Sequence, residues 1–339
     1  MNARDDREAW ARTAGAQGLI VNQGCNREDR AIQPLAHRQQ STAASGGKRA
    51  IASPRAASQT RALVFLTALG LAVGIACLLR YLEMHAAGRG PVALAATISL
   101  TFALAVWGLH GGTAGAACSG GAICLLLASA TMRPAHSLFA SALSPLVVLF
   151  VLTFLATRLG RQRKLVLGLA EPREGRHAAQ VLANLGAAGL ISSATLILTA
   201  RTSLAAHPPA TFAPVLILAA LAEATADTVS SEIGQAFGGT PRLLTRFEPV
   251  APGTDGAISL LGTSAGILGA AIITLSGVLA SGLDLRAAGT ILLAAVVGLF
   301  FDSLLGATVE RRGLLNNDLV NFSPTVFAVL AAWVIQRFF

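Results

Sequence analysis

The sequence carries little charge for a chain of 339 residues. Asp, Glu, Lys and Arg make up only 13% of it, whereas 53% is hydrophobic, and the mean hydropathy is +0.62. A soluble domain carries roughly a quarter charged residues, so the composition excludes an ordinary soluble protein. It predicts a polytopic membrane protein, whose length is better counted in bilayer crossings than in soluble domains.

The common catalytic and metal-binding motifs are also lacking. The chain has no HExxH, Walker or GxGxxG motif. Its one GxSxG string, Gly262-Thr-Ser-Ala-Gly266, lies within an apolar run and not at a predicted strand-to-helix turn, so nucleophilic catalysis gains no support. Its four cysteines have no CxxC spacing, which predicts neither a metal site nor a disulfide framework. The net charge of +9 comes from basic residues without interleaved aromatic residues, so we expect no nucleic-acid partner.

Residues 1–61 differ in composition from the rest of the chain. They are rich in Arg, Ala, Gln and Ser, have no sustained apolar period, and lack the apolar core and cleavage site of a signal peptide. We therefore predict a disordered, basic, cytosolic tail at 1–61 and an integral membrane domain at 62–339. A start codon assigned too far upstream would explain the same composition, so translation of the tail stays open.

Apolar runs of about 20 residues, the length that spans a bilayer, recur through the membrane domain. They cover residues 62–80, 91–109, 114–131, 137–157, 178–200, 211–231, 257–280 and 287–308, and a shorter ninth run covers 323–338. Ser119-Gly-Gly in the third run indicates a broken or tightly packed helix. The pattern predicts an all-α bundle of eight or nine transmembrane helices.

Basic residues set the expected orientation. They precede the first run and crowd the loop at 158–177, which places both in the cytosol. Counting crossings then puts His110-Gly-Gly-Thr and the loops at 231–256 and 309–322 on the same side. Because every polar cluster of the membrane domain falls on one face, we predict an active site at the cytosolic membrane surface.

Acids and hydroxyls follow one another at the end of the sixth run. In a helix Glu223, Asp227 and Ser231 lie on one face. Carboxylates at the end of a lipid-length segment are costly unless they are paired, hydrated or bound to a cation. A few oxygen ligands match Mg²⁺. The alternative is a helix end whose acids are solvated or paired with Arg246.

Two glycine-containing strings follow this segment, Gly238-Gly-Thr-Pro-Arg242 and Pro252-Gly-Thr-Asp255-Gly. Glycines let the backbone approach a ligand, and successive N–H groups can hold phosphate oxygens. Arg242 adds a positive charge. An ordinary turn remains the alternative for both strings.

A third group of polar residues begins inside the eighth run. Asp302 lies within the apolar sequence, where an acid is a functional hypothesis by default, and Glu310 shares its helix face. The alternative for Asp302 is a bond to an arginine or a neighbouring helix. Asn316-Asn-Asp318 fits a phosphate site or a helix cap.

The basic loop before the fifth run supplies a fourth group. Arg173 and Arg176 suit a polyphosphate, although the positive-inside rule alone explains their presence. Gln180 and Asn184 lie one turn apart on the same face of the following helix. Of these, Asn184 is the strongest candidate, because it is a polar residue inside a membrane segment.

These groups resemble the motifs of one known family. The matching segments are Arg176-His-Ala-Ala-Gln-Val-Leu-Ala-Asn184, Ala226-Asp-Thr-Val-Ser-Ser-Glu-Ile-Gly234, the stretch 249–262, Asp302-Ser-Leu-Leu-Gly-Ala-Thr308 and Asn316-Asn-Asp-Leu-Val-Asn321. The family is the integral membrane family called domain of unknown function 92, which includes transmembrane protein 19 and a plant phytyl-phosphate kinase. The resemblance covers residues 62–339. Two positions depart from it: Val229 replaces a frequent aromatic residue, and Asp255 replaces a frequent Asn or Ser.

The resemblance implies a membrane kinase that transfers a phosphoryl group from a nucleoside triphosphate, with CTP favoured, to an isoprenyl monophosphate. We expect Mg²⁺ as the cofactor, held by Asp227, Glu232 and Asp302. The expected phosphate-binding or orienting residues are Arg173, Arg176, Asn184, Arg242, Gly253, Thr254, Asn316, Asn317 and Asp318. Phosphoryl transfer fits a chain with acids, arginines and glycines but no nucleophile, since it depends on positioning and charge neutralisation.

Two other classes of function stay open. A cation- or proton-coupled transporter of a small or lipid-like substrate would place its acids near mid-bilayer and show inverted repeats. A non-catalytic membrane protein would use the same residues for packing. The role of Glu223, one turn deeper than Asp227, is open in the same way.

Overall fold

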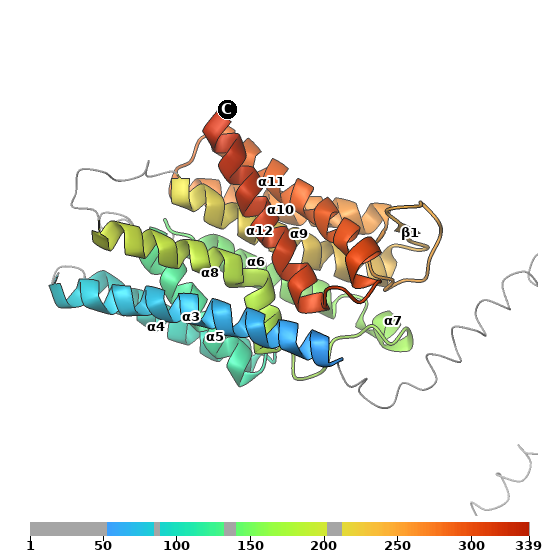
Figure 1. Cartoon of the computed structure of the whole chain (residues 1–339), viewed down its shortest axis with the longest axis horizontal. Coiled ribbons are helices and arrows are strands. Elements are labelled where there is room, and N and C mark those ends of the chain that lie inside the picture. The colour runs from blue at the N-terminus through green and yellow to red at the C-terminus, as the bar shows by residue number, and fades with distance from the viewer. Residues whose placement is uncertain (1–52, 85–88, 132–139, 202–211, 339) are drawn as a thin grey trace, which may run out of the picture. The chain divides into compact units, whose positions relative to one another are not determined.

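The computed structural model describes residues 53–84, 89–131, 140–201 and 212–338 (Figure 1). These residues are almost entirely helical. The helices are α3 (Pro54–Met84), α4 (Arg89–Gly108), α5 (Ala114–Thr131), α6 (Leu143–Arg158), α7 (Arg161–Val166), α8 (Ala178–Arg201), α9 (Phe212–Phe237), α10 (Leu260–Ser281), α11 (Leu285–Leu305), the π-helix η2 (Gly306–Glu310) and α12 (Asn317–Phe338). Two short antiparallel strands, β1 (Arg242–Leu243) and β2 (Ala257–Ile258), close the loop between α9 and α10.

The predicted helical membrane bundle is confirmed. Eight helices within the described ranges are long and apolar enough to cross a membrane. The ninth, α6, has 16 residues and is about 24 Å long, which is less than the roughly 30 Å of a bilayer core. The short element is therefore α6, and not the predicted short run at 323–338, because α12 begins six residues earlier, at Asn317.

Helix α9 occupies the centre of the bundle. Every residue from Val215 to Ala226 is buried, and α9 packs against α6, α8, α10, α11 and α12. Its contact with α10 is close because α10 presents glycines. A Cβ atom at Gly266 would lie 2.5 Å from the Ala226 carbonyl oxygen, and one at Gly262 would lie 2.6 Å from that of Ser230. Small residues hold this pair together, as expected for helices in lipid.

Helix boundaries differ from the prediction in several other places, and α6 begins only at Leu143. Residues 54–61 were predicted to belong to the tail but form the first two turns of α3, and residues 1–52 of the predicted tail lie outside the described residues. The run at 257–280 begins with β2, so α10 starts only at Leu260. Helix α9 continues to Phe237, six residues past the predicted end, because polar residues there still face neighbouring elements.

The polar segments gather at one end of the bundle, as the sequence predicts. In Figure 1 the start of α3, the helix α7 and the strand β1 lie at this common end. The loop at 110–113 is bonded to the loop before α8: the N–H of Thr113 donates to the Arg176 carbonyl at 2.9 Å. We call this the polar end. Its assignment to the cytosol stays a prediction.

Candidate functional site

A polar cavity of about 260 Å³ opens among the helices at the polar end. Helices α8, α9, α11 and α12 and the loop between α9 and α10 form its wall. The lining includes the acids Glu171, Asp227, Glu232, Asp255, Asp302 and Glu310, the base Arg176, the amides Gln180, Asn184, Gln235, Asn317 and Asn321, the hydroxyl residues Thr228, Ser230, Ser231, Thr254, Ser259 and Ser303, and the glycines Gly234, Gly253, Gly256 and Gly306. Eight of the predicted site residues lie in the cavity wall: Arg176, Asn184, Asp227, Glu232, Gly253, Thr254, Asp302 and Asn317.

Asp227 and Asp302 form the centre of this cavity. They come from α9 and α11, and their carboxyl groups lie within hydrogen-bonding reach of each other. The Ser231 hydroxyl lies 3.5 Å from Asp227 Oδ1, and Oδ1 of Asp302 is buried without a hydrogen-bond partner among the described residues. Two facing carboxyl groups with an unsatisfied oxygen are a costly arrangement, which a bound cation or a shared proton would stabilise.

The loop with Gly253 and Thr254 is held against α11 by a contact between two glycines. A Cβ atom at Gly256 would lie 2.5 Å from the Ser303 carbonyl oxygen, and one at Gly306 would lie 2.6 Å from the Gly256 nitrogen. Gly306 is where α11 changes to the π-helix η2, and such single turns are frequent at functional sites. The contact brings the loop and the acids of α11 to the same cavity.

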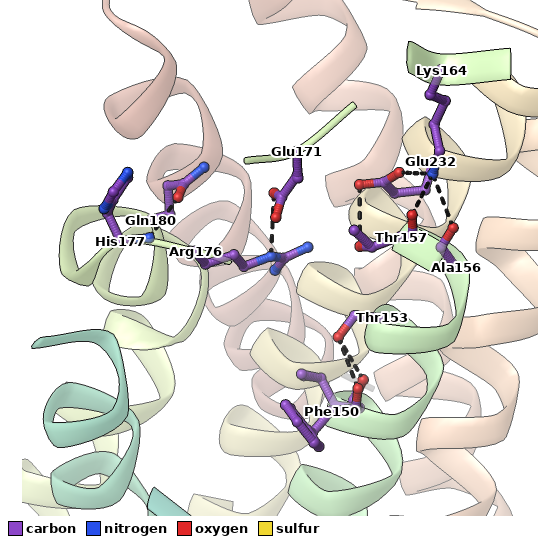
Figure 2. Close-up of polar contacts among 11 residues, drawn as sticks. Phe150, Thr153, Ala156, Thr157, Lys164, Glu171, Arg176, His177, Gln180 and Glu232 are labelled. Atoms are coloured by element: carbon purple, nitrogen blue, oxygen red, sulfur yellow. Dashed lines mark hydrogen bonds and ion pairs between the residues drawn. The ribbon is translucent and has the colours of Figure 1, made fainter. Parts of the chain in front are cut away.

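The His110-Gly-Gly-Thr string positions Arg176. The Arg176 N–H donates to the Gly111 carbonyl at 3.2 Å, and a Cβ atom at Gly175, whose φ is +76°, would lie 2.6 Å from the Gly112 nitrogen. The guanidinium Nε lies 3.6 Å from Oε1 of Glu171 (Figure 2). Arg176 therefore faces the cavity on a backbone that is fixed from both sides.

Glu232 was predicted to be the third magnesium ligand, and the structure gives it a different partner. Its Oε2 accepts a hydrogen bond from Lys164 Nζ at 2.5 Å, and its Oε1 accepts one from the Thr157 hydroxyl at 3.2 Å (Figure 2). Lys164 is only 1% exposed and also donates to the carbonyl of Ala156. This ion pair attaches α7 to α9. Within the described ranges no three Asp, Glu, His or Cys side chains are grouped as a metal centre would need.

Two residues of the predicted Asn316-Asn-Asp318 group bind α3 and do not line the polar cavity. Asn316 Nδ2 donates to the Thr60 hydroxyl at 2.7 Å, and that hydroxyl donates to Asp318 Oδ2 at 2.5 Å. Asn316 Oδ1 also accepts from the Leu319 N–H at 3.0 Å, which makes it the N-cap of α12. The intervening Asn317 lines the cavity. These contacts depend on Thr60, which the sequence places in the predicted tail and the structure places in α3.

The two remaining arginines also lie away from the polar cavity. Arg242 donates to the Phe247 carbonyl at 2.8 Å and so closes its own loop. Arg173 lines a second, mostly apolar cavity of about 100 Å³, and we call this the apolar cavity. Asn184, Thr228, Arg176 and Glu171 line both cavities. Asn184 is buried, as predicted, and stands at the boundary between them.

Two acids of the cavity were noted in the sequence without a committed role. Glu310 lies in η2, and Asp255 lies in the loop that Gly256 anchors. Partial burial raises the pKa of Asp255, and the positive charge of Arg311 opposes this shift. Lys164 was hidden among the basic residues of its loop. Its spacing of three from Arg161 gave no signal of burial.

Glu223 is the deepest acid of α9. It is 1% exposed, and neither carboxylate oxygen has a hydrogen-bond partner among the described residues. The methylene groups of Glu223 pack against α11 at Gly298, which has no side chain. A Cβ atom at Gly298 would lie 2.5 Å from Glu223 Cγ. With α9 extended to Phe237, Glu223 lies near mid-helix and Asp227 about 15 Å from the helix end.

The residues of the polar cavity fit Mg²⁺. The ion prefers oxygen ligands and is usually held by one or two carboxylates together with waters and substrate phosphates. Asp227 and Asp302 supply two facing carboxyl groups, and the buried Oδ1 of Asp302 has no partner within the described ranges. The cavity therefore suits a cation shared with a bound phosphate better than a cation enclosed by protein ligands alone.

The fold and the cavity define a multi-pass helical membrane protein with an acid-lined site at one end of the bundle. A family model described as integral membrane protein DUF92 matches residues 97–329. The chain belongs to this family, as the motifs indicated. No solved structure matches the chain.

Several relatives share part of the chain. It is 46% identical over 109 residues to the uncharacterized membrane protein MJ0933 of Methanocaldococcus jannaschii, a match that covers 32% of this chain and 45% of the relative. It is 32% identical over 195 residues to the chloroplastic protein VTE6 of Arabidopsis thaliana, over 56% of both chains. Protein PGR of the same plant is 29% identical over 201 residues, or 53% of this chain and 69% of the relative. The chain thus spans about half the length of the first two relatives.

Proposed function

We propose that the protein is a membrane-embedded kinase that transfers a phosphoryl group from a nucleoside triphosphate, CTP being the favoured donor, to an isoprenyl monophosphate. The observation that carries this proposal is the pair of facing acids, Asp227 and Asp302, in a polar cavity that also contains Arg176. The phosphoryl-transfer chemistry that the family resemblance implies needs this combination of carboxylates and a fixed positive charge.

The residues of the cavity divide the work between them. Asp227 and Asp302 would hold Mg²⁺, which when bound supplies charge neutralisation at the β- and γ-phosphate oxygens. Arg176 is held by Gly111 and Gly112 and would contact a phosphate of either substrate. Gly253 also lines the cavity, where its backbone N–H would orient a nucleotide phosphate, whereas the Thr254 N–H donates to the Ala251 carbonyl at 3.2 Å and closes the turn.

The transfer step needs no general base. An oxygen of the isoprenyl monophosphate is already ionised near neutral pH and attacks the γ-phosphorus of the nucleotide. The bond between that phosphorus and the β–γ bridging oxygen breaks, and the nucleoside diphosphate leaves with the electron pair. The chain contributes position and charge. This explains why the cavity contains acids, amides and an arginine but no histidine or cysteine among its lining residues.

The experiment is a direct assay of the purified protein in lipid nanodiscs. The protein is incubated with Mg²⁺, CTP and geranylgeranyl or phytyl monophosphate, and the isoprenyl diphosphate is measured by mass spectrometry. We expect diphosphate and CDP in equal amounts, and none when the chelator EDTA is added. Absence of product with every nucleoside triphosphate and every prenyl monophosphate tried would contradict the proposal.

One observation favours a second candidate, a cation- or proton-coupled transporter. Glu223 lies near the middle of α9 with both carboxylate oxygens unpartnered among the described residues, and acids at that depth occur along ion and proton pathways. Flux of protons or Na⁺ into liposomes that is lost in Glu223→Gln, together with no kinase activity, would support this reading over the first.

A further inference from the structure

The apolar cavity lies beside the polar cavity and is built from different side chains. It passes between α4, α5, α6, α8 and α9. Its apolar lining includes Phe102, Gly120, Leu146, Leu149, Phe150 and Phe154. The phenylalanine rings form a continuous series, with centroids 5.5 Å apart for Phe102 and Phe150 and 5.6 Å apart for Phe150 and Phe154.

We propose that the apolar cavity binds the hydrocarbon chain of an isoprenyl phosphate, and that Gly120 determines how long a chain it accepts. The identity of the phosphate group rests on the proposed function. The site of the hydrocarbon chain rests on three separate observations: the continuity of the two cavities, the distribution of charge along the apolar cavity, and the empty space at Gly120.

The two cavities share a wall. Arg176, Asn184 and Thr228 line both of them. A molecule that passes this wall has its phosphate beside Arg176 and the acids of α9 and α11, and its chain beside the phenylalanines. The amide of Asn184 is buried at this point, where it can donate to the oxygen that joins chain and phosphate.

Charge along the apolar cavity is also arranged for an anionic amphiphile. Arg158, Arg161 and Arg173 lie at the mouth, and the guanidinium of Arg158 lies 4.4 Å from the Phe154 ring centroid. Below them Thr153 is the deepest polar side chain that α6 contributes to the cavity wall, and its hydroxyl donates to the Leu149 carbonyl at 2.9 Å. Positive groups at the mouth and an apolar interior match a phosphate with a hydrocarbon chain.

The dimensions favour a single chain. Arg158 and Leu146 both line the cavity and are twelve residues apart on α6, a separation of about 18 Å along the axis. An isoprene unit has four main-chain bonds and extends about 5 Å, given carbon–carbon bonds of about 1.5 Å. The cavity depth thus corresponds to roughly three to four units. Its volume of about 100 Å³ excludes a two-chain lipid, and a chain of three to four units enters only if the lining side chains move apart.

Gly120 leaves space at the deep part of the cavity. A Cβ atom there would meet only Phe102 Cε1, at 3.8 Å, which is an ordinary contact. Gly121, the next residue, is different, since a Cβ atom there would lie 3.1 Å from Ala103 Cβ on α4. A larger side chain at position 120 therefore enters the cavity, whereas one at 121 separates α4 from α5.

The test compares chain lengths in Gly120→Leu. Binding of radiolabelled geranyl and geranylgeranyl monophosphate to the protein in nanodiscs is measured without nucleotide. We expect geranylgeranyl monophosphate to bind at least about tenfold more weakly than to wild type, because the leucine side chain takes the space that the far isoprene units would occupy. Geranyl monophosphate should bind within about twofold of wild type. Cys118→Leu, on the exposed side of the same helix, is the matched control and should change neither.

A second measurement does not depend on how the variant folds. A geranylgeranyl phosphonate with a diazirine at its chain end is crosslinked to the wild-type protein, and the labelled residues are identified by mass spectrometry. Label on Phe102, Gly120 or Leu146 supports the proposal. Label on lipid-facing residues of α3 or α10, equal losses for both chain lengths in Gly120→Leu, or displacement by dioleoyl phosphatidic acid as effective as by unlabelled geranylgeranyl monophosphate would overturn it.

The outcomes separate this inference from the proposed function. Chain-selective binding that depends on Gly120, with no diphosphate from any nucleotide, keeps the site and rejects the kinase. Diphosphate formation whose chain-length preference is the same in wild type and Gly120→Leu keeps the kinase and rejects the site.

Discussion

Asp227 and Glu232 are five residues apart on α9, yet the structure gives them opposite surroundings. Asp227 faces another acid, Asp302, across a cavity. Glu232 faces Lys164, which is buried and holds no other carboxylate among the described residues. A carboxylate paired with a lysine of its own chain stabilises the fold, whereas two carboxylates that face each other destabilise it until something else binds. The side chain that each acid faces, and not its place on α9, therefore distinguishes a structural acid from a candidate ligand.

The same contrast holds for the two asparagines at the start of α12, Asn316 and Asn317. Asn316 uses its side-chain amide to bind α3 and its oxygen to cap α12. Asn317 lines the polar cavity. Four residues that looked equivalent in sequence therefore fall into two classes, and variants of each pair test whether the division is correct.

The largest effect is expected for Asp227→Asn. The change removes one of the two facing carboxylates, so we expect kinase turnover to fall by roughly 10²–10³-fold, as for loss of a group that stabilises transition-state charge. The thermal midpoint in detergent should stay the same or rise, because the repulsion between Asp227 and Asp302 is gone. Turnover is measured from diphosphate production under saturating CTP.

Glu248→Gln is the control for this variant, since Glu248 is exposed at the polar end and does not line the polar cavity. It should keep wild-type turnover. Full activity in Asp227→Asn would remove the facing acids from the site.

The next largest effect is expected for Glu232→Gln, and it should be on stability. Removing one partner of a buried ion pair costs about 3–5 kcal/mol, because the remaining charge is left uncompensated. Lys164 would be that charge, at 1% exposure. We expect a loss near the lower limit of about 3 kcal/mol, since Glu232 is 13% exposed. Chemical unfolding in mixed micelles measures it.

The double variant Lys164→Met with Glu232→Leu provides the control, and it should recover most of the lost stability. A different result would favour the sequence-based prediction. If Glu232→Gln unfolds like wild type but loses magnesium-dependent activity, Glu232 is a metal ligand and the contrast with Asp227 fails.

Much of the fold was predictable because its determinants are local. Apolar runs gave the membrane helices, although the starts of α3, α6 and α12 and the end of α9 lie six or more residues from the predicted bounds. The basic loops gave a common end for the polar segments. The start of α3 was not predictable in this way. Residues 54–61 have a polar composition and become helical where Gln59 and Thr60 contact Asn316, more than 250 positions away.

The candidate site was predictable only in part, for the same reason. Asp302 inside an apolar run is conspicuous without a structure. Whether an acid such as Glu232 is free depends on Lys164, 68 positions earlier and one of several basic residues in its loop. Arg242 likewise looked like a phosphate ligand until its bond to the Phe247 carbonyl was known. Sequence spacing gives the residues that share a helix face, but not the partners from other elements.

A smaller effect is expected for the two asparagines, on stability for Asn316 and on nucleotide binding for Asn317. Asn316→Ala removes the cap of α12 and the bond to Thr60, so we expect it to cost about 1–2 kcal/mol of stability and to leave turnover within about twofold. Asn317→Ala should leave stability unchanged and raise the KM for CTP several-fold, since its side chain lines the cavity. Unfolding curves and steady-state kinetics of both variants give the comparison. The same phenotype for both would show that the division by partner is wrong here.

The smallest effect concerns Asp255, in the loop between α9 and α10. Partial burial raises its pKa in the folded protein, and Arg311 opposes this shift. Between about pH 4, the ordinary Asp pKa, and the raised value, the folded state binds more protons than the unfolded state. The contribution of Asp255 to stability therefore falls as pH rises through this window.

Asp255→Asn should remove this pH dependence. The thermal midpoint of the variant should therefore rise relative to that of wild type from pH 4 upward, and the difference should stay constant above the window. Arg311→Gln should raise the pKa further and steepen the slope. Parallel midpoint curves for wild type and Asp255→Asn would contradict this, and would place Asp255 with the solvated acids and not with Asp227.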